Sequence, residues 1–76
     1  MPKLDRITID PAVMGGKPCI RGLRVTVGTI MGLISAGKSQ EEILALYPYL
    51  VAADIDDVLA YATWRVKEQE VAVGAA

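Results

Sequence analysis

Residues 39–67 read SQEEILALYPYLVAADIDDVLAYATWRVK and carry the clearest helix signals of the chain. It opens on Ser39 with a glutamate three residues later, which is a capping box and predicts a helix start. The pair Tyr47-Pro48 ends that helix, because a residue before proline is disfavoured in the helical region. A second apolar stripe predicts a longer helix over residues 52–67. A short helix, a break and a longer helix are the outline of a helix-turn-helix.

A further helix is predicted just before this pair. Apolar residues recur there at helical spacing, at Val27, Ile30, Met31 and Ile34. Thr26 is the candidate N-cap, and Gly37 lies just past the expected end, where glycine is favoured. The sequence therefore predicts a unit of three helices.

The amino-terminal part carries the pattern of two short strands. Residues 6–10, RITID, alternate polar and apolar side chains, which predicts a half-buried strand. Residues 11–18 hold two prolines and a glycine pair and are expected to form a loop. Residues 20–26 can return as a second strand beside the first. Two strands alone are marginal, so we expect them to pair with the same strands of a second chain across a two-fold axis.

The apolar surface of the last helix exceeds what one small core needs. Its predicted core stripe comprises Ile55, Val58, Leu59, Ala62 and Val66. Tyr61 and Trp64 fall on an adjoining face, which suits core or dimer packing or, as the alternative, contact with a partner helix. The residues predicted to pack in a dimer or against a partner are Ile7, Ile9, Tyr61 and Trp64.

The composition limits the chemistry of the chain. Its 76 residues allow one small domain, and 53% of them are hydrophobic. Cys19 is the only cysteine and there is no histidine, so an internal disulfide, the usual zinc sites and nucleophilic catalysis have no candidates. We therefore expect no enzyme activity, no metal and no cofactor, and we expect a homodimer to supply the missing burial. Apolar runs of four to five residues and the absence of an apolar leader predict a cytoplasmic protein that does not enter a membrane.

The net charge of −1 hides a division along the chain. Residues 1–38 hold six basic and two acidic residues, a net charge of +4, whereas residues 39–76 hold two basic and seven acidic residues, a net charge of −5. The two halves are therefore suited to different partners or to each other, with chance as the alternative explanation.

Basic side chains gather in the segment rich in glycine and proline. We predict that it faces an acidic partner site or nucleic-acid phosphate, with Lys17, Arg21 and Arg24 as contacts and Lys38 as a further one. As the alternative, Arg21 and Arg24 form intramolecular or dimer ion pairs with Asp10 and the acidic third helix. The sequence leaves both interpretations open.

The start of the third helix is poorly suited to reading DNA. It offers Asp54, Asp56 and Asp57 and no basic residue before Arg65, and phosphates repel such a helix. A metal site is the alternative use of these carboxylates, but first-turn carboxylates are already favoured by the helix dipole. Operator DNA is therefore expected to be bound through the basic segment or only together with a protein partner.

Several motifs in this order are similar to the domain-of-unknown-function family four-thirty-three. They are GGKPCIRGLRV over residues 15–25, YPYL over residues 47–50 and AYA over residues 60–62, and the resemblance extends from about residue 4 to residue 67. It implies a homeodomain-like helical unit with an added amino-terminal β segment, usually dimeric. It also implies the antitoxin of a bacterial type II toxin-antitoxin pair whose toxin resembles PIN-domain ribonucleases. Leu23 and Val51 depart from the threonine or serine that members often have there.

Together these observations predict a mainly α protein, with a single helix-turn-helix domain over residues 1–70 and a flexible tail over residues 71–76. The favoured function is an antitoxin-like binding protein that neutralises a PIN-like ribonuclease and represses its own operon. The alternative is a standalone helix-turn-helix transcription regulator. A third hypothesis is a dimerisation or adaptor module that binds no nucleic acid.

Overall fold

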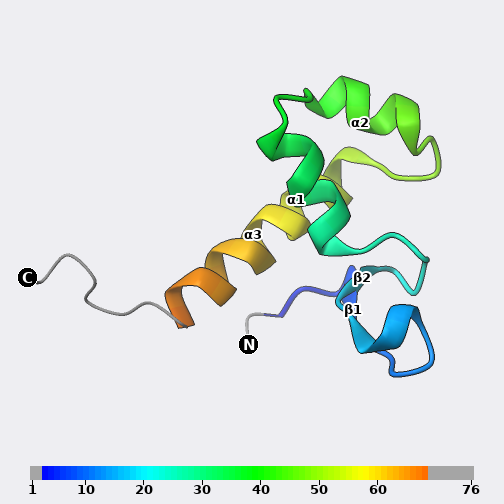
Figure 1. The fold of residues 1–76 in the computed structure, drawn as a ribbon, viewed down its shortest axis with the longest axis vertical. Coiled ribbons are helices and arrows are strands. Elements are labelled where there is room, and N and C mark those ends of the chain that lie inside the picture. The colour runs from blue at the N-terminus through cyan, green and yellow to red at the C-terminus, as the bar shows by residue number, and fades with distance from the viewer. Residues whose placement is uncertain (1–2, 69–76) are drawn as a thin grey trace, which may run out of the picture.

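The computed structural model describes residues 3–68, and the predicted tail at 71–76 lies outside the described residues. The elements in chain order are β1 (Ile7–Thr8), the 3-10 turn η1 (Met14–Gly16), β2 (Cys19–Ile20), α1 (Val27–Ser35), α2 (Gln40–Leu46) and α3 (Ala52–Glu68). Figure 1 shows the hairpin at one end of the molecule and α2 at the other, with α1 and α3 between them. The prediction of a mainly helical chain with a short amino-terminal β segment is confirmed.

The strands are shorter than the sequence pattern indicates. β1 and β2 pair antiparallel with Ile7 opposite Ile20, and neither strand extends further. The chain turns back directly after β2, because Arg21 and Gly22 both adopt positive φ angles, of 48° and 71°, as in the tight primed turns. The Ile20 N–H then donates to the Val25 carbonyl at 3.0 Å. A second strand beside the first is thus confirmed, but it spans Cys19–Ile20 and not residues 20–26, because the segment after Ile20 folds back on itself instead of running along β1.

Local hydrogen bonds start the helices where the sequence predicts. The Thr26 hydroxyl accepts from the Thr29 N–H at 3.0 Å and caps α1. At α2 the Ser39 N–H donates to the Glu42 carboxylate at 2.9 Å, and the Glu42 N–H donates to the Ser39 hydroxyl at 3.1 Å. These bonds complete the capping box. Gly37 follows α1 at a φ of 89°, a conformation that favours glycine.

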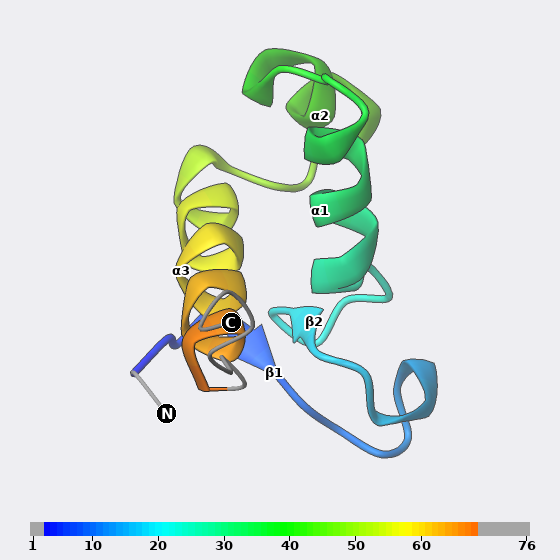
Figure 2. The same ribbon diagram turned by 60° about the vertical axis from the view of Figure 1, so that its left-hand side comes forward.

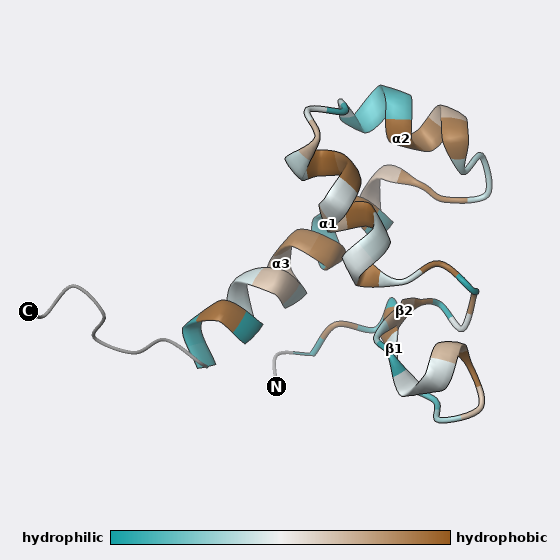
Figure 3. Ribbon diagram, in the orientation of Figure 1, coloured by the Kyte–Doolittle hydropathy of each residue, from teal (hydrophilic) through white to brown (hydrophobic). Residues whose placement is uncertain are grey.

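The core lies where α1, α3 and the hairpin meet. Figure 2 shows α1 and α3 side by side with α2 across one end, and Figure 3 shows the hydrophobic residues along these elements. The buried apolar side chains come from every helix and from both strands: Ile7, Cys19, Ile20, Val25, Val27, Ile30, Ile43, Leu50, Ile55, Val58 and Tyr61. No helix within residues 3–68 combines the length and apolar character that crossing a membrane requires.

The buried face of α3 differs from the predicted stripe. Leu59 and Val66 are exposed, at 41% and 67%, whereas Tyr61 and Asp54 are buried. The buried positions step from Asp54 to Val58 and Tyr61, at intervals of four and three residues, on the side that packs against α1 and β1. α3 also runs on past the end of the packed region (Figure 1). Its outer apolar residues are therefore left uncovered by the described chain.

Candidate functional site

A buried carboxylate lies in the first turn of α3. The side chain of Asp54 is fully buried, and both of its oxygens have partners. The Arg21 guanidinium donates from Nε to Oδ1 at 3.0 Å and from Nη2 to Oδ2 at 3.1 Å. Arg6 Nη1 lies 3.4 Å from Oδ1, and the Val51 N–H donates to Oδ2 at 2.9 Å. The charge is thus neutralised and hydrogen-bonded, as burial of an ion requires.

Arg21 connects the hairpin to the turn between α2 and α3. Besides its two bonds to Asp54, its Nη2 donates to the Tyr49 carbonyl at 2.9 Å. Its backbone N–H donates to the Arg6 carbonyl at 2.8 Å, which holds the turn after β2 against the start of β1. The structure therefore pairs Arg21 with the acidic third helix, one of the two arrangements that the sequence left open. The side chain is still 38% exposed.

Sequence reasoning did not predict that Asp54 and Arg6 belong to this network. It grouped Asp54 with Asp56 and Asp57 as carboxylates favoured by the helix dipole, and it named the third helix as a whole as the alternative partner of Arg21. A usable signal was present, because Asp54 lies four and seven residues before the apolar Val58 and Tyr61, on one helix face. A carboxylate on a buried face requires a cation, and Arg21 is one of the basic residues that the sequence singles out.

The environment of Asp54 acts on its pKa in two opposing ways. Burial raises the pKa, since it disfavours the charged form. The hydrogen bonds from Arg21 and the Val51 N–H, together with the charges of Arg21 and Arg6, outweigh burial and leave the pKa of Asp54 below its usual range. The folded state therefore holds this proton less tightly than the unfolded chain does.

This shift predicts how stability depends on pH. A carboxyl group whose pKa is lowered by folding stabilises the protein above its unfolded pKa, and this contribution is lost as the pH falls below about 4 toward the folded value. We expect the free energy of unfolding of the wild type to decline in that range and to decline less steeply in Asp54→Asn. Hydrogen bonds with Ser39 also lower the pKa of Glu42. Because Glu42 is present in both proteins, it contributes the same loss of stability at low pH to each. Urea unfolding at several pH values measures this, and parallel curves would contradict the assignment.

The other predicted cations occupy two separate places. Lys17 precedes β2 and Arg24 follows the turn after it, so the structure brings them to the same hairpin as Arg21. Lys38 lies beyond the carboxyl end of α1, at the other end of that helix. The three side chains of Lys17, Arg24 and Lys38 are exposed, and none of them has a salt-bridge partner among residues 3–68.

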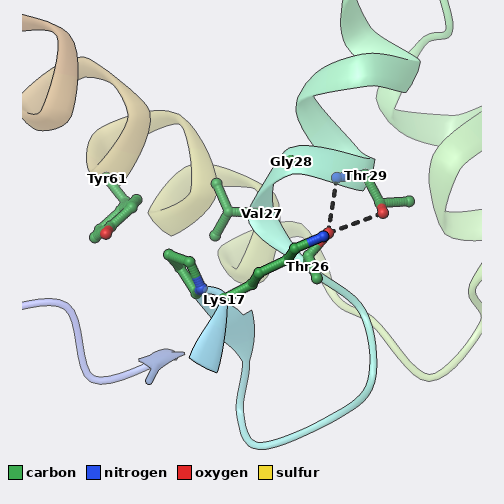
Figure 4. Close-up of a pocket in the computed structure, with 7 residues that line it drawn as sticks. Lys17, Thr26, Val27, Gly28, Thr29 and Tyr61 are labelled. Carbon is green, nitrogen blue, oxygen red and sulfur yellow. Dashed lines mark hydrogen bonds between the residues drawn. The ribbon is translucent and has the colours of Figure 1, made fainter. Parts of the chain in front are cut away.

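A cleft of about 580 Å³ opens at the amino-terminal end of α1. It lies between the segment that holds Lys17, the first turn of α1 and Tyr61 of α3 (Figure 4). Figure 4 shows Lys17 extending across the α1 start, where Thr26 caps the helix. The positive end of a helix and an ammonium group both favour anions. The cleft is therefore suited to a carboxylate or phosphate of a partner, not to a cation.

The predicted packing residues divide into inner and outer ones. Ile7 and Tyr61 are 6% and 7% exposed and belong to the core of this chain. Ile9 is 55% exposed, and Trp64 is half-buried with its ring centroid 5.8 Å from that of Tyr61. Packing of these residues against a second chain stays a prediction.

The other polar residues show no metal-binding arrangement within the described chain. No three carboxylate or thiol side chains of residues 3–68 are grouped as cation ligands. Cys19 is 1% exposed and its thiol donates to the Lys17 carbonyl at 3.3 Å.

A small three-helix unit with a docked amino-terminal hairpin defines the class of this protein. The chain belongs to the family described as "Protein of unknown function (DUF433)", which matches residues 7–62. This range runs from β1 into α3 and includes Arg21 and Asp54, so the family resemblance seen in the sequence motifs is confirmed.

A relative in Sinorhizobium fredii (strain NBRC 101917 / NGR234), described as "Uncharacterized protein y4eO", is 38% identical to the chain over 56 residues. The aligned part covers 74% of this chain and 25% of the relative, so the chain spans about a quarter of the length of that protein. No solved structure matches the chain.

Proposed function

We propose that this protein is an antitoxin-like binding protein that neutralises a PIN-like ribonuclease. A nuclease of that kind gathers carboxylates around divalent metal, and an inhibitor has to offer cations to this acidic site. The observation that carries the proposal is the basic hairpin, defined here as residues 17–24. Its exposed Lys17 and Arg24 have no salt bridge among residues 3–68, while its Arg21 is held on α3.

The anchoring of Arg21 supports binding by a preformed surface. The bonds from Arg21 to Asp54 and to the Tyr49 carbonyl tie the hairpin to the helical unit. Cations on a fixed scaffold lose less conformational freedom on binding than cations on a flexible chain. The anion-favouring cleft beside Lys17 adds to this surface.

DNA binding through the predicted recognition helix has less support. In the first turns of α3 Asp54 is buried and paired, Asp56 is exposed and Asp57 is half-buried. Basic residues of α3 come only near its end, at Arg65 and Lys67. The helix order still supports a homeodomain-like arrangement. Repression of its own operon is part of the proposal, with DNA bound through the basic hairpin or in complex with the toxin.

A homodimer is also part of this proposal.

Replacing Lys17 and Arg24 with alanine together is expected to weaken binding to the toxin by about tenfold or more, because two charge-assisted contacts are lost. The fold should be retained, since both side chains are exposed. The measurement is co-expression with the product of a neighbouring PIN-like reading frame, if the gene has one, with growth rescue and pull-down affinity as readouts. Arg21 is unsuitable for this purpose because its loss would release the hairpin.

Lys3→Ala is the control for the loss of a positive charge, because it removes an exposed cation that lies outside the basic hairpin. Equal rescue by the double variant and the wild type would remove the hairpin from the interface. Absence of a PIN-like reading frame beside the gene, together with a salt-sensitive shift of the promoter by the protein alone, would favour the standalone transcription regulator instead.

A further inference from the structure

An apolar groove runs along the outer side of α3. Its volume is about 280 Å³, and it is lined by Met31 of α1 and by Leu59, Ala62, Thr63, Val66 and Lys67 of α3. The Thr63 hydroxyl donates to the Leu59 carbonyl at 2.8 Å, so it needs no partner outside the helix. Apart from Lys67, the groove therefore holds no polar group that would oppose burial.

We propose that this groove is the contact between two copies of the chain, with α3 packed antiparallel on α3 of the second copy. Leu59 and Val66 are equally far in sequence from a point between Ala62 and Thr63. A two-fold axis at this point places Leu59 against Val66 of the partner subunit, and the reverse contact follows by symmetry. The small residues at the axis let the two helices approach closely.

The charges beside the groove fit the same axis. Asp56 and Lys67 are exposed on one flank of the Leu59–Val66 stripe, and neither has a salt bridge among residues 3–68. In an antiparallel pair the same flanks of the two helices face each other, so Asp56 lies near the partner's Lys67. Asp56 and the partner's Lys67 are offset along the helix axis by two residues, or about 3 Å, which is within reach of a lysine side chain. The symmetric dimer thus gains two ion pairs.

This charge pattern selects both the occupant and its direction. A parallel two-fold pair would set the flank with Asp56 and Lys67 against the opposite flank of the partner helix, so neither ion pair would form. An unrelated partner helix would need an acidic residue near Lys67 and a basic residue near Asp56, which a second copy already supplies. The inference rests on the homodimer in the proposed function and is independent of the toxin.

The molar mass of the full chain in solution tests the interface. The wild type is expected to be a dimer and Val66→Glu a monomer by light scattering at about 100 μM protein, since the variant places two buried carboxylates in one contact. Val66 is 67% exposed in the single chain, so the substitution should leave the helical circular dichroism of the protein unchanged. Leu46→Glu is the matched control, because Leu46 is 57% exposed on α2 and lies outside the groove.

A charge exchange tests the direction of the helices. Asp56→Lys and Lys67→Asp should each weaken dimerisation by about tenfold, and the double variant should restore it, because the pairs re-form with opposite sign. Failure of the double variant to restore the dimer would overturn the antiparallel arrangement.

The remaining outcomes also decide the proposal. A dimer that survives Val66→Glu but dissociates in Ile9→Glu would place the contact at the strands and overturn the groove interface alone. If the wild type is monomeric and the Val66→Glu variant loses toxin binding, the groove is assigned to the toxin. If the wild type is monomeric and the Val66→Glu variant still binds toxin, the dimer is overturned and toxin binding stands.

Discussion

Asp54→Ala is expected to lower the free energy of unfolding by about 3 kcal/mol, because it removes charge-assisted hydrogen bonds and the cap at the start of α3. The substitution abolishes both hydrogen bonds from Arg21 and the one from the Val51 N–H. It also opens the start of α3, where that N–H is satisfied by the Asp54 side chain. Urea unfolding followed by circular dichroism, at one fixed protein concentration, measures the change.

Asp57→Ala is the control for this substitution. Asp57 is only half-buried, lies three residues further along α3 and has no salt bridge among residues 3–68, so we expect a change below about 1 kcal/mol from the helix dipole alone. Equal losses in the two variants would mean that the buried network adds nothing beyond a carboxylate near the start of α3. Asp54→Asn should fall between the two, because the amide keeps an acceptor but carries no charge.

Ile30→Ala is expected to destabilise the protein by about 3 kcal/mol, because it removes buried apolar atoms and leaves a cavity. Ile30 is fully buried in α1, on the side that packs against α3. In a domain of this size such a loss is a large part of the total stability. Thermal and urea unfolding of the wild type and the variant measure this loss as a shift of both midpoints.

Leu46→Ala is the control, since Leu46 has the same number of side-chain carbons as isoleucine but is 57% exposed on α2. Its effect is expected to stay within about 0.5 kcal/mol. A loss as large as that of Ile30→Ala would show that α2 packs more closely in solution than its exposure indicates.

The helix starts could be predicted because their signals are local. Ser39 and Glu42 bond to each other within one turn, and Thr26 caps a helix through Thr29, three residues on. Such contacts are encoded in neighbouring residues and need no knowledge of the rest of the chain. The helical class, the helix boundaries to within a residue or two and the family resemblance followed from patterns of this kind.

The second strand was overestimated because its end depends on a distant contact. Alternation of side chains predicts extended backbone through residue 26, but Arg21 adopts a positive φ that a non-glycine residue rarely takes. Its guanidinium is held at Asp54, 33 residues further along the chain. The turn and the ion pair support each other, and no window of the sequence contains both.

The candidate site was predicted in part for the same reason. Sequence composition identified the basic hairpin, and the structure places Lys17 and Arg24 on its exposed surface. Composition could not distinguish Arg21 from Lys17 and Arg24, because Arg21 differs from them only in its pairing with a buried carboxylate on α3. Composition also could not show that Lys38 lies apart from the hairpin, because the two are at opposite ends of α1.

Three helices with their caps, a short β segment and a basic amino-terminal half can be predicted from the sequence, since they follow from local bonds and composition. The burial of Asp54 against Arg21 and the outward position of Leu59 and Val66 depend instead on the packing of segments distant in sequence. α3 is apolar over more than one face, and the sequence pattern alone does not say which face the core takes. Packing against α1 and the hairpin makes that choice, and it leaves the groove beside Leu59 and Val66 uncovered by the described residues.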